Sequence, residues 1–267
     1  MSTQHRISLT SVSKRFASPG HGKPDTEVLR NVSLSLADGE FVCLLGPSGC
    51  GKSTILNMVA GFEHADSGAV LLDGKPITQP GPERGVVFQQ PTLFPWLNVQ
   101  ENIAFGPRIT DQPKAAYQQQ VNHYLEQVGL VEFADHYPWQ LSGGMRQRAA
   151  LARAWLPNPE ILLMDEPFGA LDAQTRLEMQ ELLVSIWERT RTTILFVTHD
   201  IDEALFLADR ILVMSARPGV ISEELKVPFE RPRTPEDLVA DPVYGGLKRD
   251  ILHVLRQEAG KRVAAGH

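Results

Sequence analysis

Short runs of hydrophobic residues recur along the chain and predict buried strands. Phe41–Leu45, Ile161–Met164 and Thr193–Thr198 are mostly apolar, which is typical of parallel strands covered on both faces. Alternating hydrophobic and polar positions at Ile7–Thr10 and Val32–Leu36 instead predict strands with one buried face. Further short strands are predicted at Ala69–Leu72, Gly85–Phe88 and Arg210–Met214. The apolar runs therefore suit buried parallel strands, and residues 6–45 are predicted to be rich in strands.

Helical patterns lie between these strands. Ser53–Ala60 is one candidate helix, and Gly61 is its expected stop. A polar segment places hydrophobic residues on one helical face, at Tyr117, Val121, Tyr124, Leu125 and Val128. A further helix is predicted to open at Leu141–Met145 and to run to Leu156, and Asp172 is predicted to cap a long amphipathic helix. A short terminal helix is predicted to carry Leu247, Ile251, Val254 and Leu255. The proline-rich, charged stretch from Arg217 to this last helix is predicted to be a linker.

A glycine-rich loop joins the strand Phe41–Leu45 to the helix that follows it, and it fits the pattern G-x-x-x-x-G-K-[ST]. Its glycines let the backbone wrap a phosphate chain, with amide hydrogens pointing inward at a helix N-terminus. Lys52 supplies a positive charge for the outer phosphates, and the Ser53 hydroxyl is the expected Mg²⁺ ligand. A chance match in an ordinary turn is the alternative, but the flanking strand and helix disfavour it. The candidate loop residues are Gly46, Pro47, Ser48, Gly49, Cys50, Gly51, Lys52, Ser53 and Thr54.

Composition excludes few functions. The 267 residues are 42% hydrophobic and 22% charged, as in an ordinary soluble protein with a core. The formal net charge of −6 gives no support to nucleic-acid binding. A membrane-spanning helix needs about 18 or more consecutive apolar residues, and the sequence has no such run. Cys43 and Cys50 have no metal-ligand spacing and are interpreted as two reduced thiols.

Two carboxylates, Asp165 and Glu166, stand at the tip of the strand that begins at Ile161. Asp165 suits the Mg²⁺ shell of a phosphate-loop enzyme, and Glu166 suits a base that activates the attacking water. The alternative is a solvated strand end. Gln89, which closes the strand Gly85–Phe88, either ends that strand in solvent or reaches a metal or a water.

Three other parts of the chain contain candidate ligand-binding residues. Ser142, Gly143 and Gly144 open a helix and offer a hydroxyl and free amides to an anion, although the same residues also make a plain helix cap. His199 follows a buried strand, on the edge where doubly wound sheets bind ligands, which favours function over a structural role. Phe16, after the N-terminal strand, either stacks on a base or simply packs, and the sequence leaves both open.

Taken together, these segments resemble the ATP-binding subunit of an ABC transporter. The signature motif, Leu141–Met145, discriminates best between families, because few other phosphate-loop NTPases have Ser-Gly-Gly at this place. Phe16 takes the A-loop position, where tyrosine is commoner, and Met145 stands where many members have glutamine. The motifs follow the family's order: Gly46–Ser53 for the phosphate loop, Gln89 for the Q-loop, Leu141–Met145 for the signature, Ile161–Asp165 for Walker B with Glu166 as catalytic glutamate, Gly169–Asp172 for the D-loop, and His199 as switch histidine.

The resemblance implies an α/β fold: a RecA-like P-loop NTPase core with a mainly parallel sheet, an antiparallel β subdomain and a helical subdomain inserted at about 91–156. The ATPase domain would cover residues 5–225, and residues 226–267 would form a linker and a short helical tail. Within the family the chain resembles the nitrate/sulfonate/taurine importer group. The segments behind this narrower resemblance are Pro80–Gln89, Leu93–Trp96, Phe168–Asp172 and Ser215–Gly219.

The resemblance also implies cofactors and partners. ATP would bind with Mg²⁺, which Ser53, Gln89 and Asp165 would hold. Glu166 and His199 would be catalytic. Two copies would meet head to tail, so that each ATP contacts the phosphate loop of one copy and the signature of the other. The contacts across this interface would come from Ser142, Gly143, Gly144 and Asp172. The homodimer would sit on a transmembrane permease dimer at the cytoplasmic face of the inner membrane, served by an extracytoplasmic solute-binding protein, and no nucleic acid is expected.

Two rival functions are compatible with a phosphate loop. A non-transport ABC ATPase acting in DNA repair or translation typically has long coiled-coil insertions or two cassettes, and this sequence has neither. A small-molecule kinase or unrelated NTPase is disfavoured by the signature. The apolar segment Phe94–Trp96, directly after Gln89, predicts a docking surface for the permease with Trp96 partly exposed. A core tryptophan is the alternative there.

Overall fold

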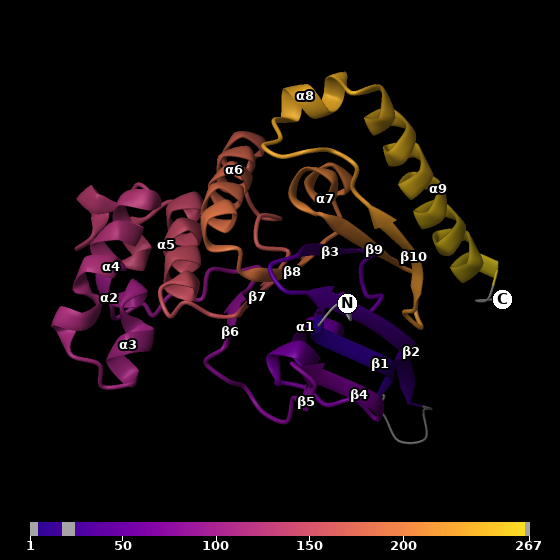
Figure 1. The fold of residues 1–267 in the computed structure, drawn as a ribbon, viewed down its shortest axis with the longest axis horizontal. Helices are drawn as coiled ribbons and strands as arrows, with labels where there is room; N and C mark the ends of the chain where they lie inside the picture. Colours follow the sequence, from indigo (N-terminus) through magenta and orange to yellow (C-terminus); the bar gives the residue numbers. More distant parts are fainter. Residues whose placement is uncertain (1–4, 18–24, 265–267) are drawn as a thin grey trace. The chain divides into compact units, whose positions relative to one another are not determined.

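The computed structural model describes residues 5–17 and 25–264, with side chains described as far as Glu258. The predicted loop at residues 18–24 lies outside the described residues. The chain divides into two units, which Figure 1 draws as a ribbon. Unit 1 combines residues 1–80 and 193–267, and unit 2 consists of residues 81–192.

Unit 1 begins with an antiparallel sheet in the strand order β2-β1-β4-β5. Ile7, Leu9 and Val12 of β1 are buried while the residues between them are partly or fully exposed, which confirms the alternating pattern. Asp73 and Gly74 join β4 to β5 with φ of 47° and 76°, the left-handed pair that a two-residue hairpin turn requires. The strands are β1 (His5–Phe16), β2 (Thr26–Ala37), β4 (Ser67–Leu72) and β5 (Lys75–Pro76).

A second sheet in unit 1 has the order β10-β9-β3-β8. β3 runs parallel to β8 and β9, and β10 runs antiparallel to β9. Every residue of β3 and β8 is buried, as expected for strands covered on both faces. Leu45 pairs with Thr198, so β3 and β8 end together at one edge of the sheet. The elements are β3 (Phe41–Leu45), α1 (Lys52–Ala60), β8 (Thr193–Thr198), α7 (Ile201–Leu207), β9 (Arg210–Met214) and β10 (Ile221–Lys226).

The stretch after Arg217 differs from the predicted linker. β10 extends the second sheet, and Arg233 is buried with its Nη1 donating to the Ala208 carbonyl at 2.6 Å. Burial lowers the pKa of Arg233 to about 10. The proline-rich, charged stretch is therefore a packed part of unit 1. Its arginines donate hydrogen bonds to backbone carbonyls at the end of α7.

The terminal helix also differs from prediction, because it is long. α8 (Pro235–Ala240) is followed by α9 (Pro242–Ala264), a helix of 23 residues. Gly245 and Gly246 weaken its intrinsic helix propensity. Tertiary contacts compensate for this low helix propensity. Lys248 on α9 lies 2.7 Å from the Asp202 carboxylate on α7, and the Tyr244 hydroxyl donates to the same carboxylate.

Unit 2 contains two parallel strands and a helical lobe with its own core. β6 pairs with β7 in parallel. Helix α4 buries Tyr117, Val121 and Leu125 on the predicted face, and they join a buried cluster that extends from Leu93 to Leu156. The elements are β6 (Arg84–Val87), α2 (Val99–Ile103), α3 (Phe105–Ile109), α4 (Lys114–Gln127), short 3₁₀ turns at Val131–Phe133 and Pro138–Gln140, α5 (Gly143–Trp155), β7 (Ile161–Asp165) and α6 (Ala173–Thr190).

Candidate functional site

The glycine-rich loop connects β3 to the N-terminus of α1, as predicted. Gly51 precedes the helix with φ of 104°, and a Cβ there would lie 2.5 Å from Leu29 Cδ2 on β2. Only glycine fits this position, because it tolerates the left-handed backbone and leaves room for Leu29. The sequence therefore turns sharply here and presents the first amides of α1, the geometry that favours an anion.

Lys52 points its side chain back into the same loop. The residue is 5% exposed, and its Nζ donates to the carbonyls of Gly46 at 2.7 Å and Pro47 at 3.1 Å. Burial in a polar loop keeps the ammonium close to the backbone that would enclose a phosphate. Ser53, the next residue, is exposed at the start of α1, where a hydroxyl can reach a metal beside the phosphates.

His199 lies at the same edge of the sheet as the glycine-rich loop. It directly follows Thr198, whose partner Leu45 directly precedes the loop. Asp200 then caps α7 by accepting hydrogen bonds from the amides of Asp202 at 2.9 Å and Glu203 at 3.2 Å. His199 is exposed between these fixed neighbours. An imidazole in this place can contact a ligand held by the loop.

Phe16 ends β1, and its ring is 39% exposed. Lys14 Nζ lies 5.2 Å from the ring centroid, a distance at which a cation is attracted to an aromatic face. Phe16 pairs with Thr26 of β2, the strand whose Leu29 packs on Gly51. The ring is therefore on the sheet that borders the glycine-rich loop and keeps enough exposed surface to stack on a base.

In unit 2, a tight turn after β7 places Gly169 beside both the Glu166 carbonyl and the Gln89 side chain. Glu166 follows β7 with φ of 44°, an unusual value for a residue with a side chain. Its carbonyl accepts from the Gly169 amide at 3.2 Å, and a Cβ on Gly169 would lie 3.9 Å from Gln89 Nε2. Asp165 is the last residue of β7. Asp165, the candidate base Glu166 and the side-chain amide of Gln89 thus lie around one loop at the end of β7.

Ser142 is the N-cap of α5, and its Oγ accepts the Met145 amide at 3.2 Å. A Cβ on Gly144 would lie 2.6 Å from Thr175 Cγ2, so the start of α5 packs closely on the start of α6. Asp172 caps α6 by accepting the Thr175 amide at 3.0 Å and its hydroxyl at 2.7 Å. These two bonds, the amide first, lower the pKa of Asp172. Thr175 therefore joins the signature to Asp172, a role that the sequence did not predict.

The segment after Gln89 is held from within by Asn102, which is fully buried. Its Nδ2 donates to the carbonyls of Phe94 at 3.1 Å, Leu97 at 2.9 Å and Asn98 at 3.0 Å, and its Oδ1 accepts the Phe94 amide at 2.8 Å. Trp96 is 69% exposed, with its ring centroid 5.5 Å from that of Phe94. The expectation of a partly exposed Trp96 is confirmed, and the core alternative is wrong.

A cavity of about 720 Å³ opens beside this segment. Its lining is largely apolar and includes Phe88, Phe94, Phe105, Pro107 and Ile109. Phe94 packs on Phe105 with ring centroids 4.2 Å apart, so the aromatic wall is continuous. A groove of this kind is typical of a surface that receives another protein segment.

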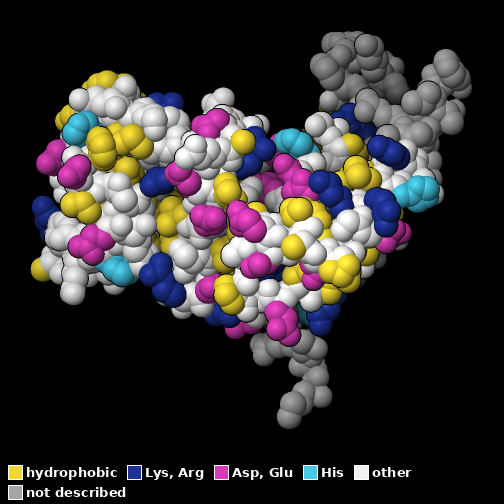
Figure 2. All heavy atoms as spheres, turned by 90° about the horizontal axis from the view of Figure 1, so that it is seen from above, with side chains coloured by type: hydrophobic (Ala, Val, Ile, Leu, Met, Phe, Trp, Pro, Cys, Tyr) yellow, Lys and Arg dark blue, Asp and Glu magenta, His cyan; other side chains and the backbone are white. Residues whose placement is uncertain are grey.

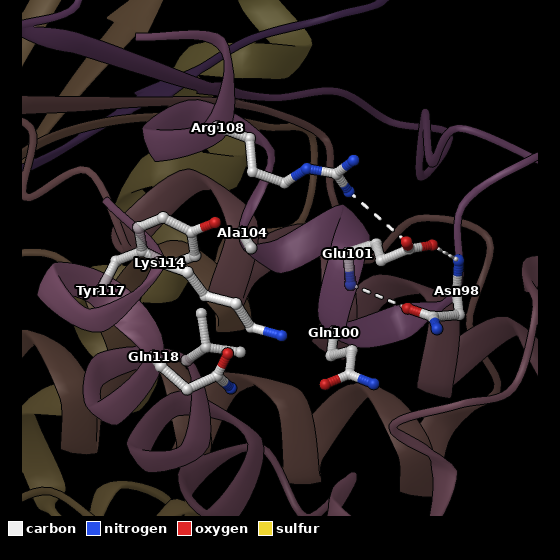
Figure 3. A pocket seen from close by; sticks show the side chains of 9 residues that line it. Asn98, Gln100, Glu101, Ala104, Arg108, Lys114, Tyr117 and Gln118 are labelled. Carbon is white, nitrogen blue, oxygen red and sulfur yellow. Dashed lines mark hydrogen bonds and ion pairs between the residues drawn. The ribbon is translucent and has the colours of Figure 1, made fainter. Parts of the chain in front are cut away.

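A second cavity, of about 330 Å³, lies between α2, α3 and α4 (Figure 3). Lys114 extends its amino group into it between Gln118 and Gln100, and Arg108 lies 3.6 Å from Glu101 at its rim. None of the predicted site residues lines this cavity.

On the face that Figure 2 shows, basic and acidic side chains are interspersed with hydrophobic ones.

The described residues test the metal and membrane expectations in part. They contain no group of three or more His, Cys, Asp or Glu side chains arranged for a metal ion. The proposed Mg²⁺ ligands, Ser53, Gln89 and Asp165, all carry oxygen donors, which suit an ion that proteins usually hold with one or two carboxylates plus substrate phosphates. No helix in the described ranges is both long and apolar enough to cross a bilayer. Cys43 and Cys50 are both buried thiols, and burial raises the pKa of the Cys43 thiol.

Comparison with known proteins decides the family. The ABC transporter family profile matches residues 29–169, from β2 to the loop after Glu166. The chain belongs to the ABC transporter family. The nitrate import ATP-binding protein NrtD of Synechococcus elongatus is 49% identical over 91% of this chain and 89% of its own length. The taurine import ATP-binding protein TauB of Roseobacter denitrificans is 45% identical over 93% of both chains.

Solved structures agree with the family. The ATP-binding cassette MJ0796, in a dimer bound to ADP and Pi, superposes with a TM-score of 0.73 at 32% identity, covering 84% of this chain and all of that one. Clostridium perfringens cbiO1, part of the cbiONQ transporter complex, gives a TM-score of 0.75 at 25% identity, covering 97% and 99% of the two chains. The fold is that of a P-loop NTPase, and the chain is an ATP-binding subunit with ATPase activity.

Proposed function

We propose that this chain is the ATP-hydrolysing subunit of an importer for a small solute of the nitrate, sulfonate or taurine class. The observation that carries the proposal is the identity of 45–49% to nitrate and taurine import subunits across more than nine-tenths of the chain. The glycine-rich loop, with its fixed Gly51 and buried Lys52, supports nucleotide binding. This favours transport over the alternative of an ATPase acting in DNA repair or translation.

In the proposed catalytic cycle two copies share each ATP. Unit 1 offers the phosphate loop and His199, and unit 2 offers Ser142–Gly144 at the start of α5. The loop encloses the phosphates from one side only, so a second helix N-terminus would complete the cage around the γ-phosphate. The dimeric structure of the MJ0796 cassette with ADP and Pi supports the pairing of two copies. Gly143, Gly144 and Asp172 of the second copy would join Ser142 in contacting the nucleotide.

Hydrolysis would use the residues around Glu166. Its carboxylate would take a proton from the attacking water, while His199 would hold the γ-phosphate. Mg²⁺ would neutralise negative charge on the phosphates. Ser53, Gln89 and Asp165 would hold it, and Phe16 would stack on the adenine. The exposed Ser53 hydroxyl and the nearness of Gln89 to the Glu166 turn are compatible with these roles.

The homodimer would act on a permease dimer at the cytoplasmic face of the inner membrane, together with an extracytoplasmic solute-binding protein. The cavity beside Phe94 and the exposed Trp96 would receive the permease. Membership of cbiO1 in a transporter complex supports a membrane partner of this kind. The solute itself would be selected by the partner proteins.

Uptake into proteoliposomes tests the proposal. The chain is reconstituted with the permease and binding protein encoded beside it, with ATP inside the vesicles, and labelled nitrate, taurine and an alkanesulfonate are offered separately. We expect ATP-dependent uptake of one of them, abolished in the Glu166→Gln transporter. An assembled transporter that hydrolyses ATP but moves none of these solutes would contradict the solute class, and a chain that fails to assemble with any permease would contradict transport.

A further inference from the structure

The loop between β9 and β10, residues 215–219, has no role in the function described above, yet it lies against the glycine-rich loop. A Cβ on Gly46 would lie 3.0 Å from Met214 Cβ, directly before this segment. A Cβ on Gly219 would lie only 2.0 Å from the Cys50 carbonyl oxygen. Both ends of the segment therefore touch the phosphate loop as closely as glycine allows.

The segment is itself firmly held. The Gly219 amide donates to the Val28 carbonyl at 2.8 Å, and the Gly219 carbonyl accepts the Arg30 amide at 3.1 Å, which ties it to β2. Ser215 is buried, and its Oγ accepts the Val220 amide at 3.0 Å and donates to the Pro218 carbonyl at 3.2 Å. The segment is thus a fixed platform from which its one long side chain extends.

That side chain is Arg217, and its guanidinium forms hydrogen bonds with the phosphate loop. Its Nη2 and Nε donate to the Gly49 carbonyl at 3.1 Å and 3.3 Å. Gly49 has φ of 77° and lies at the exposed turn of the loop. A hydrogen bond from a charged donor is stronger than one between neutral groups, so this contact constrains the peptide between Gly49 and Cys50.

The direction of that peptide decides what its amide can do. Because a trans peptide is planar, its carbonyl and its N–H point in opposite directions. Arg217 holds the Gly49 carbonyl, so the Cys50 amide is turned to the opposite side. There it donates to the Pro47 carbonyl at 3.4 Å, a long and weak bond. The amide is therefore fixed in direction and easily transferred to a stronger acceptor.

We propose that Arg217 is a positioning residue for nucleotide binding: it clamps the Gly49 carbonyl so that the Cys50 amide is presented to a bound phosphate. This rests on the proposed function, because it assumes that the loop binds a nucleotide. Arg217 acts through the backbone of the loop. The platform at residues 215–219 places this exposed side chain within hydrogen-bond distance of the loop.

Nucleotide affinity of the full-length chain tests the clamp. We expect Arg217→Ala to raise the Kd for a fluorescent ATP analogue about tenfold, which is about 1.4 kcal/mol. The melting temperature is expected to stay unchanged, because the side chain is exposed. Arg217→Lys and Arg217→Gln, which keep a donor, are expected to recover part of the affinity. The Cys50 amide resonance should move in Arg217→Ala before any nucleotide is added, which a loss of surface charge alone would not produce.

Arg30→Ala is the matched control. Arg30 is an exposed arginine beside the same segment, and its Nε donates to Glu27 at 2.9 Å. It is expected to bind ATP as wild type does. The clamp is refuted if Arg217→Ala binds within twofold of wild type or no more weakly than Arg30→Ala. Lys52→Ala separates this failure from a wider one: normal ATP affinity in that variant would instead contradict nucleotide binding at the loop.

Discussion

Replacing Trp96 by alanine distinguishes a docking surface from a structural contact. The side chain is 69% exposed, so only about a third of the roughly 250 Å² that a buried tryptophan hides is covered. At about 25 cal/mol per Å², this burial contributes at most about 2 kcal/mol, and less because unfolded chains also bury apolar surface. A core tryptophan replaced by alanine costs about 3–5 kcal/mol. Trp96→Ala should therefore lower the free energy of unfolding by less than about 2 kcal/mol.

Urea unfolding of the isolated subunit measures this difference. Trp155→Ala is the internal standard, because Trp155 is fully buried in α5 of the same unit. If Trp96→Ala lost as much stability as Trp155→Ala, its effects on transport would follow from misfolding and the docking argument would fail.

Assembly with the permease measures docking itself. Trp139 is 66% exposed but lies outside the segment after Gln89, so Trp139→Ala is matched in exposure. We expect Trp96→Ala, and not Trp139→Ala, to weaken co-purification with the permease or to uncouple hydrolysis from uptake. ATP affinity of the isolated subunit should be normal in Trp96→Ala. Equal assembly of both variants and wild type, with normal coupling, would refute docking at Trp96.

Three further outcomes are expected. Glu166→Gln should keep ATP affinity but lose about 10²–10⁴-fold in turnover of the assembled transporter, because a general base is removed; near wild-type hydrolysis would contradict that role. Ser142→Arg and Lys52→Ala chains should each be inactive alone, yet their mixture should recover ATPase activity because mixed dimers retain one intact shared site; an inactive mixture would count against sharing. Asn102→Asp should lower the free energy of unfolding by about 3 kcal/mol or more, measured in urea, because three partly buried carbonyls lose their donor.

The sequence predicted those elements whose chemistry is local. The loop Gly46–Thr54 was recognisable because strand, glycines and helix follow one another within a single segment. The caps at Ser142 and Asp172 were predicted from residue type at a helix start, and both accept the amide three residues on. Such features need no knowledge of what packs against them.

Contacts between distant segments could not be predicted in this way. Thr175 lies close to both the signature and Asp172 only because α5 and α6 start side by side. The long helix α9 was underestimated because Gly245 and Gly246 weaken it locally, whereas Tyr244 and Lys248 anchor it to Asp202. Tertiary packing overrides local propensity in these cases.

The geometry of unit 2 links its docking segment to the signature through one helix. Ser142 is the N-cap of α5. In the last turn of the same helix, Arg153 Nη1 donates to the Thr92 carbonyl at 2.7 Å. The Arg153 guanidinium also lies 5.3 Å from the Phe94 ring centroid, and burial lowers the pKa of Arg153. A displacement of the signature end of α5 would therefore be carried to the wall of the cavity beside Phe94, since a helix moves as a rigid element. Under the proposed function, α5 itself would couple nucleotide and permease, because the helix that would complete the ATP site also supports the surface that would bind the membrane partner.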